Sequence, residues 1–170
     1  MFTHLGEDAT VLIIDNLIAA KKIQPMLVIM PDANTGASAF DESGLIKFEL
    51  ELNNMIIPFV EKNYRVKTDA NSRALAGLSM GGIHTLYTGI KHSDNFSYLG
   101  VFSSGWIIPN QNEIANKQYT YLKDNTNTIN KNLKQFWISM GGKEDIAYKN
   151  CQLMLAKFKE MKINFWNKRI

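Results

Sequence analysis

A serine flanked by glycines is the feature of this sequence most typical of a catalytic group. Gly77-Leu78-Ser79-Met80-Gly81 has the pattern Gly-X-Ser-X-Gly. The apolar residues 74–76 before it predict a short buried strand, and apolar residues at helical spacing follow it. A sharp turn between a strand and a helix is the setting of a nucleophile elbow, which holds a strained serine with its hydroxyl exposed. A glycine-rich turn with an incidental serine is the alternative interpretation.

A serine hydroxyl becomes a useful nucleophile only when a base takes its proton and a carboxylate orients that base. In an elbow, the N–H of Met80 would point to where a tetrahedral oxyanion forms. Asp145 follows the predicted strand 136–140 directly, which makes it the best candidate for the acid. Its alternative role is an N-cap, since a helix is predicted from Ile146 and aspartate is favoured there.

The base is harder to place, because the chain has three histidines: His4, His84 and His92. His84 lies five residues after Ser79 in the predicted helix, so its side chain should point away from the serine and pack or face solvent. His92 lies near the end of the same helix, too far along its axis. Nothing around His4 indicates a site, and no histidine follows Asp145.

Two further residues have structural alternatives. Trp106 comes at the end of a predicted strand, where it would either bind substrate beside Ser79 or close off the core. Cys151 lies on an apolar helical stripe and is expected in the core. As the single cysteine, it excludes an internal disulfide and a cysteine-rich zinc site.

Composition is ordinary for a globular protein and predicts a single domain over residues 1–170. The 170 residues are 45% hydrophobic and 21% charged, with a net charge of +3. Lysines are scattered, so no basic run predicts binding to nucleic acid or an anionic membrane. No apolar run approaches the roughly 18 residues of a membrane span. The first residues, MFTHLGED, are not typical of a signal peptide.

Apolar runs and helical stripes alternate along the chain. Helices are predicted at residues 9–22 (with Asp8 as a possible N-cap), 45–60, 83–90 and 147–161; strands at 26–30, 74–76, 97–103, 136–140 and, less regularly, 163–166; and irregular helix and loop at 110–134. This alternation predicts an α/β fold, a three-layer α/β/α sandwich with a mostly parallel sheet. Sites in such sheets lie at the carboxyl ends of strands. The candidate positions are therefore the loop after Pro31, Ser79, the loop 103–106 and the loop 143–145.

Taken together, AGLSMGG, the preceding FVEKNYRV and the later GGKEDIAYKNCQ resemble the esterase D-like branch of the α/β-hydrolases. The feruloyl and acetyl-xylan esterases, family-one carbohydrate esterases, are the most similar group. The resemblance runs from about residue 13 to residue 163. It implies an α/β-hydrolase fold and a serine esterase without metal or organic cofactor. Ser79 matches the family's nucleophile, Met80 its oxyanion N–H and Asp145 its acid.

Measured against this family, two segments have no counterpart among residues 1–170. Members of the family carry a Gly-Gly-His segment well after the acid, which supplies the base. They also carry a His-Gly loop that supplies the second oxyanion donor, and this loop would precede Met1. Residues 26–30 resemble the family's fourth strand and residues 74–78 its fifth, between which its third strand normally lies. The fold is therefore expected to be incomplete and truncated at both ends. Its exposed strand edges would favour association of copies.

Two functions follow. The first is a carboxylic ester hydrolase that forms an acyl-serine intermediate on acyl or feruloyl esters of plant polysaccharide. The alternative is a non-catalytic hydrolase-like domain, with a binding role or none. The intact elbow favours the enzyme, and the missing histidine favours the alternative.

Overall fold

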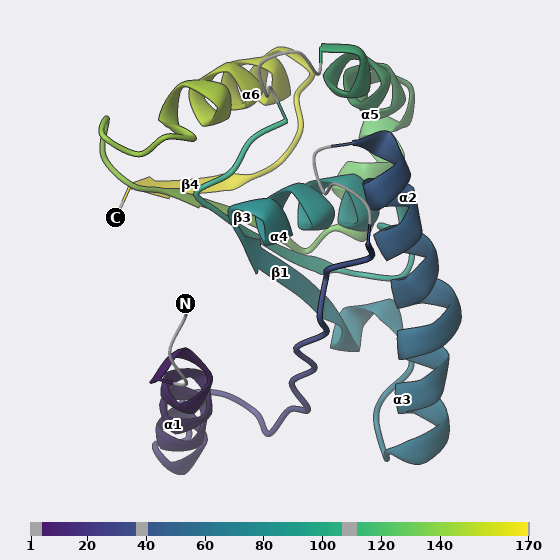
Figure 1. Ribbon diagram of the computed structural model, residues 1–170, viewed down its shortest axis with the longest axis vertical. Helices are drawn as coiled ribbons and strands as arrows, with labels where there is room; N and C mark the ends of the chain where they lie inside the picture. The colour runs from purple at the N-terminus through teal and green to yellow at the C-terminus, as the bar shows by residue number, and fades with distance from the viewer. Residues whose placement is uncertain (1–4, 37–40, 107–111, 170) are drawn as a thin grey trace. The chain divides into compact units, whose positions relative to one another are not determined.

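The computed structural model describes residues 5–36, 41–106 and 112–169 (Figure 1). Its contacts divide the chain into two units, residues 1–31 and 32–170, and each is described by itself. The prediction of one domain over the whole chain stays a prediction.

The first unit contains one helix, α1 (Leu5–Ala19). It starts before Asp8, so the predicted N-cap was wrong and Asp8 lies within the helix. The predicted strand 26–30 was also wrong: these residues form no strand, and their side chains are between 41% and 56% exposed. A strand needs a neighbour for its backbone N–H and C=O groups, and none of the described strands pairs with this segment.

A parallel sheet is the centre of the second unit (Figure 1). Its strands lie in the order β1-β2-β3-β4, each parallel to the next. Their bounds are β1 Ala74–Leu78, β2 Tyr98–Phe102, β3 Gln135–Met140 and β4 Trp166–Arg169. The predicted α/β class and parallel sheet are confirmed. The last strand starts three residues later than expected.

Helices connect the strands. They are α4 (Met80–His84) continuing into η3 (Thr85–Gly89), then α5 (Asn112–Asn132) and α6 (Tyr148–Glu160). The expectation of irregular structure for much of residues 110–134 was wrong, because α5 is a regular helix of 21 residues. Its core positions Ala115, Tyr119, Leu122 and Ile129 are buried, which supplies a packing face despite the polar composition.

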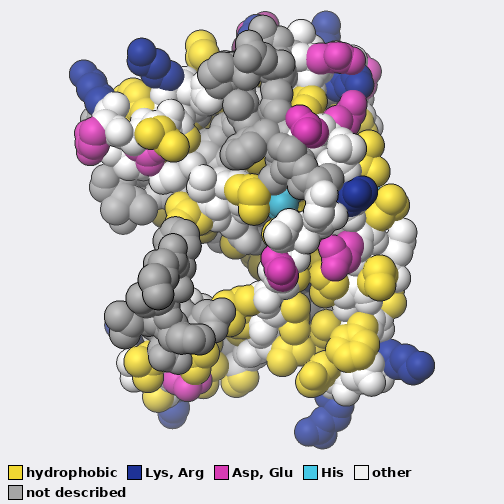
Figure 2. Space-filling model, viewed as in Figure 1, with side chains coloured by type: hydrophobic (Ala, Val, Ile, Leu, Met, Phe, Trp, Pro, Cys, Tyr) yellow, Lys and Arg dark blue, Asp and Glu magenta, His cyan; other side chains and the backbone are white. Residues whose placement is uncertain are grey.

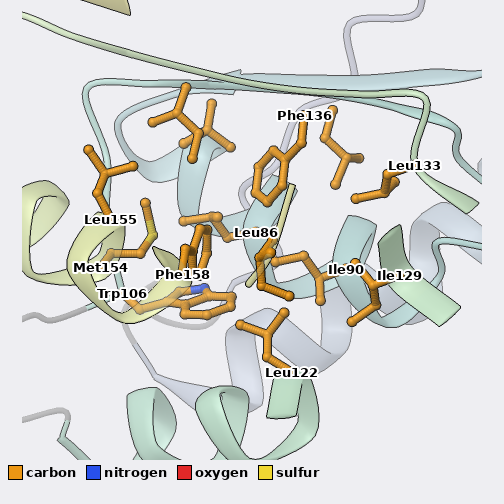
Figure 3. Packing of buried hydrophobic residues seen from close by; sticks show 14 of the residues in the cluster. Leu86, Ile90, Trp106, Leu122, Ile129, Leu133, Phe136, Met154, Leu155 and Phe158 are labelled. Atoms are coloured by element: carbon orange, nitrogen blue, oxygen red, sulfur yellow. The ribbon is translucent and has the colours of Figure 1, made fainter. Parts of the chain in front are cut away.

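The core lies on one face of this sheet (Figure 3). Leu86 and Ile90 after the elbow, Phe136 of β3 and Phe158 of α6 belong to one buried cluster. On the opposite face the side chains are more open: Leu78 is 66% exposed and Trp166 is 68% exposed. Within this unit, therefore, the elbow helix, α5 and α6 share a core on the same side of the sheet.

The long amphipathic helix predicted before the elbow is present as α2 (Glu42–Glu51), the wider π-helical turn η1 (Leu52–Ile56) and α3 (Ile57–Asn63). Leu45, Phe48 and Leu52 are its buried hydrophobic residues. Exposed hydrophobic side chains also gather on the surface around α3 (Figure 2). They include Met55 of η1, which is 66% exposed, and Phe59 of α3, which is 60% exposed.

Arg73 lies between the 3₁₀ turn η2 (Ala70–Ser72) and the first residue of β1. Its side chain links this end of the strand to α3. Its guanidinium pairs with Glu61 of α3 and donates hydrogen bonds to the carbonyl oxygens of Thr68, at 3.0 Å, and Asn95, at 2.8 Å. The donors of one planar group thus fix the start of β1 against its neighbours.

Candidate active site

Ser79 lies at a sharp turn between β1 and α4, as the sequence predicts. Its backbone has φ 53° and ψ −113°, a sparsely populated combination for a residue with a side chain. The N–H of Ser79 donates to the carbonyl oxygen of Phe102 at 2.9 Å, one step beyond the strand pair Leu78–Phe102. Ser79 itself is exposed. The turn therefore has the geometry of a nucleophile elbow, and it presents a hydroxyl at the carboxyl end of β1.

The glycines of the elbow have different structural roles. A Cβ on Gly77 would overlap the carbonyl group of Gly81 and lie 2.7 Å from its Cα, so the close approach requires glycine. A Cβ on Gly81 would meet nothing within 4 Å. A Cβ on Gly82 would lie 2.5 Å from the Cβ of Ser104. The loop after β2 therefore packs closely against α4 because residue 82 has no side chain.

Met80 is the first residue of α4, so its N–H belongs to the first turn, which has no partner within the helix. This position is compatible with the oxyanion role that the resemblance implies. The role itself stays a prediction.

Asp145 lies in the turn after β3, and β1 and β3 run parallel through β2. The carboxylate therefore lies at the same edge of the sheet as Ser79, as predicted. The helix α6 starts after Ala147, so Asp145 is not its N-cap. Its Oδ1 nevertheless accepts the Ala147 N–H at 2.9 Å.

The pKa of this carboxylate is lowered from its ordinary value. The hydrogen bond from the Ala147 N–H is the largest cause, the Ser103 side chain and the Gly141 backbone act in the same direction, and burial opposes them. A negative charge at neutral pH is the state that an orienting acid needs.

Sequence reasoning placed the loop 103–106 at this edge but assigned no role to Ser103. The structure gives Ser103 a φ of 45° and a hydrogen bond from its N–H to the carbonyl oxygen of Ser139, at 2.9 Å. A left-handed backbone at a serine, and a hydrogen bond to a residue thirty-six positions away, carry no local sequence signal. The described part of the loop after Pro31, residues 32–36, follows no strand.

Neither described histidine is hydrogen-bonded to Ser79. His84 is 2% exposed and its ring stacks on Phe48, with centroids 4.3 Å apart and an interplanar angle of 9°. His92 Nε2 lies 2.7 Å from Glu49 Oε1. The expectation that His84 packs away from the serine is confirmed. His4 lies outside the described residues.

Trp106 and Cys151 lie in the core. The indole of Trp106 is 3% exposed and contacts Tyr119 and Phe158 edge to face. Of the two alternatives for Trp106, the structure shows the core position, so its assignment as a substrate-binding residue is corrected. Cys151 is buried, as predicted, and burial together with the charge of Asp145 raises the pKa of its thiol to about 11.

Across the described ranges, no three His, Cys, Asp or Glu side chains are grouped so that they could hold a metal ion. No helix in the same ranges combines the length and apolarity needed to cross a membrane.

Ser79→Gly should be more stable than Ser79→Ala by about 1–2 kcal/mol, because both lose the hydroxyl but only glycine relieves the positive φ. Urea unfolding of the two variants under the same conditions measures the difference. Equal midpoints would show that the elbow stores no strain at this residue.

His84→Phe should flatten the dependence of stability on pH. Burial lowers the pKa of His84 from its ordinary 6.5, so below pH 6.5 the unfolded chain binds a proton that the folded chain does not. The free energy of unfolding contributed by this group is therefore full above pH 6.5 and falls as the pH drops, by at most about 1.4 kcal/mol per pH unit. Denaturant unfolding at several pH values should show a shallower decline in the variant. An unchanged slope would exclude His84 as its source.

Comparison with known proteins agrees with this geometry. A model of the esterase family, described as "Putative esterase", matches residues 9–166. The endo-1,4-beta-xylanase/feruloyl esterase of Xylanibacter ruminicola is 35% identical over 131 residues, 72% of this chain and 18% of that protein.

Solved structures share the fold. A ferulic acid esterase has a TM-score of 0.73 at 24% identity, over 92% of this chain and 66% of that one. A feruloyl esterase module from Clostridium thermocellum, solved with sinapinate, has a TM-score of 0.71 at 22% identity, over 92% of this chain and 60% of that one. The chain thus spans under a fifth of the Xylanibacter protein and 60–66% of these two structures. Its fold is that of the α/β-hydrolases, and by the match over residues 9–166 the chain belongs to the esterase family.

Proposed function

We propose that this chain carries the nucleophile and the acid of a serine carboxylic-ester hydrolase, acting on feruloyl or acetyl esters of plant polysaccharide. The observation that carries the proposal is the exposed, strained Ser79 at the same sheet edge as the hydrogen-bonded carboxylate of Asp145. The names of the Xylanibacter relative and of the fold neighbours support the feruloyl substrate class.

In the proposed reaction, Ser79 Oγ attacks the ester carbonyl carbon while a general base takes the hydroxyl proton. The Met80 N–H donates to the oxyanion that forms. When the tetrahedral species collapses, the bond to the alcohol oxygen breaks, and that oxygen takes the proton from the base. Water then hydrolyses the acyl-serine by the same steps. Asp145 orients the base and stabilises its positive charge.

His84 and His92 do not supply the base, because one ring is stacked in the interior and the other is paired with Glu49. We therefore expect the 170-residue chain alone to turn over activated esters slowly. A site that lacks one triad member can retain roughly 10³–10⁴-fold catalysis over water, which is the upper limit expected here. Natural esters need a proton donor for their leaving alkoxide and should not react measurably.

The test is release of p-nitrophenol from p-nitrophenyl acetate, with intact mass measured for the acetylated protein. Acetyl should appear on Ser79 in the unmodified chain and be absent from Ser79→Ala. The control is Ser72→Ala, which removes another exposed serine, in η2, and should react like the unmodified chain. Equal rates for Ser79→Ala and the unmodified chain would overturn the nucleophile assignment and favour a non-catalytic domain.

A further inference from the structure

The helix α2 packs on the elbow helix, α4 with η3, through a small interface of its own. Leu45 of α2 lies with Ile83 and Tyr87 of the elbow helix in a buried cluster that is separate from the main core. Ile114 of α5 packs against this cluster, whereas Phe48, further along α2, belongs to the main core. Because few side chains hold its first turns, α2 is an element that can open while the rest of the unit stays folded.

His84 of the elbow helix lies under α2 at this interface. Its imidazole stacks on the ring of Phe48, with centroids 4.3 Å apart and an interplanar angle of 9°, and the residue is 2% exposed. Its Nδ1 atom is buried and has no hydrogen-bond partner within the described ranges. A neutral imidazole fits this place as an aromatic surface, whereas an imidazolium would bury a charge and carry an N–H at Nδ1 without an acceptor.

We propose that His84 is an acid-sensitive latch, whose neutral ring holds the amino-terminal part of α2, residues 42–48, on the elbow helix and whose protonation releases that part. The inference does not rest on the proposed function, since it concerns only the packing of two helices. The elbow helix begins directly after Ser79, so release of α2 would loosen the segment that presents this hydroxyl.

The charges on the elements around His84 do not compensate an imidazolium. Burial is the cause that lowers the pKa of His84, and no charge among the described residues adds to it. On α2, Glu42 pairs instead with Lys117 of α5, which also pairs with Glu113. Lys47 of α2 is exposed. Protonation of the stacked ring is therefore relieved by release of the ring into water.

The carboxyl-terminal part of α2 has an anchor that acid does not weaken. Lys91 Nζ donates to Glu49 Oε2 at 2.7 Å, and His92 Nε2 lies 2.7 Å from Glu49 Oε1. Lys91 Nζ also donates to the hydroxyl of Tyr87 at 3.5 Å. Glu51, the last residue of α2, is half-buried. A protonated His92 would form a full ion pair with Glu49, so acid should loosen the first turns of α2 and leave this end attached.

The opening should depend on pH in a defined way. The released ring binds a proton more readily than the stacked ring, because burial lowers the pKa of His84 from its ordinary 6.5. Below pH 6.5 the equilibrium constant for opening should therefore rise by up to about tenfold for each unit that the pH falls, until the stacked ring is itself protonated. Above pH 6.5 it should stay constant.

The experiment is native-state hydrogen exchange of backbone amides in the full chain, at pH values on both sides of 6.5 and in dilute urea. Protection factors divide out the intrinsic effect of pH on exchange. Protection of residues 45–48 should fall below pH 6.5 by up to about tenfold per pH unit. It should be insensitive to dilute urea, because a local opening exposes little surface, whereas amides of β3 should be better protected and sensitive to urea.

Variants separate the latch from other effects of acid. His84→Phe keeps an aromatic ring for the stack and cannot be protonated, so the protection of residues 45–48 should no longer fall below pH 6.5. The matched control is His92→Gln, which removes the histidine at the other end of the same helix and should behave like the unmodified chain.

The proposal is overturned if residues 45–48 lose protection equally in His84→Phe, or if His92→Gln removes the pH dependence. It is also overturned if these amides match those of β3 in protection and in sensitivity to urea, because protonation would then act only through unfolding of the whole unit. The ring resonances of His84 in the unmodified chain give a second measurement: a titration midpoint at or above pH 6.5 would contradict the latch. None of these readouts depends on acetylation of Ser79.

Discussion

Gly77→Ala should lower the free energy of unfolding by about 3 kcal/mol and displace Ser79. The added methyl group would overlap the Gly81 carbonyl, and a backbone group cannot move aside as a flexible side chain can. The elbow would have to open, which breaks the register that brings the Ser79 N–H to the Phe102 carbonyl oxygen. Urea unfolding followed by circular dichroism measures the loss, and the acetylation assay should show no reaction at Ser79.

Gly81→Ala is the matched control within the same pentapeptide. Its added methyl would meet nothing within 4 Å, and alanine is favoured over glycine in a helix by about 1 kcal/mol. Its stability should therefore be unchanged or higher. Equal destabilisation by the two substitutions would contradict the elbow geometry, because it would mean that both glycines are approached closely.

Phe158→Ala should destabilise the protein by about 3–5 kcal/mol, comparable to the whole stability of many domains. The ring is fully buried in α6 and lies near the rings of Trp106 and Phe136 (Figure 3), at centroid distances of 5.6 and 5.7 Å. The ring of Phe165 lies 5.8 Å away. Truncation leaves a cavity where the helix, the sheet and the loop after β2 meet, and too few neighbours can collapse into it.

Leu153→Ala is the control for Phe158→Ala because it lies on the same helix and is 53% exposed. It should change the urea midpoint little. A loss for Phe158→Ala no larger than for Leu153→Ala would show that α6 does not anchor this core.

The sequence predicts those parts of the fold whose signals are local. The elbow can be predicted because a glycine-serine pattern, a preceding apolar run and a following helical stripe all lie within residues 73–90. The run 26–30 has an equally clear strand composition, yet it forms no strand, because pairing depends on a neighbour that composition does not reveal. In α5, the buried positions from Ala115 to Ile129 do recur at helical spacing, but the many lysines and asparagines around them obscured the pattern.

Some features of the candidate site can be predicted from the sequence in the same way, and others cannot. Ser79 and Asp145 could be placed at one edge because each follows a strand, and parallel strands bring their carboxyl ends together. The backbone of Ser103 could not be predicted, because a left-handed conformation at a residue other than glycine, and a hydrogen bond from its N–H to the distant Ser139, carry no local sequence signal. Likewise, the spacing of Trp106 could not distinguish a pocket wall from a core residue; its ring contacts do.

The sheet order β1-β2-β3-β4 follows the order of the strands along the chain. Each strand therefore finds its partner across a single connection, without waiting for a later segment to insert between two earlier ones. Each pairing therefore closes one connection only, and its loop-closure entropy is smaller than it would be if a later segment had to insert between two paired strands. During synthesis, each strand as it emerges would meet an edge already formed, so assembly can proceed from the elbow strand outward.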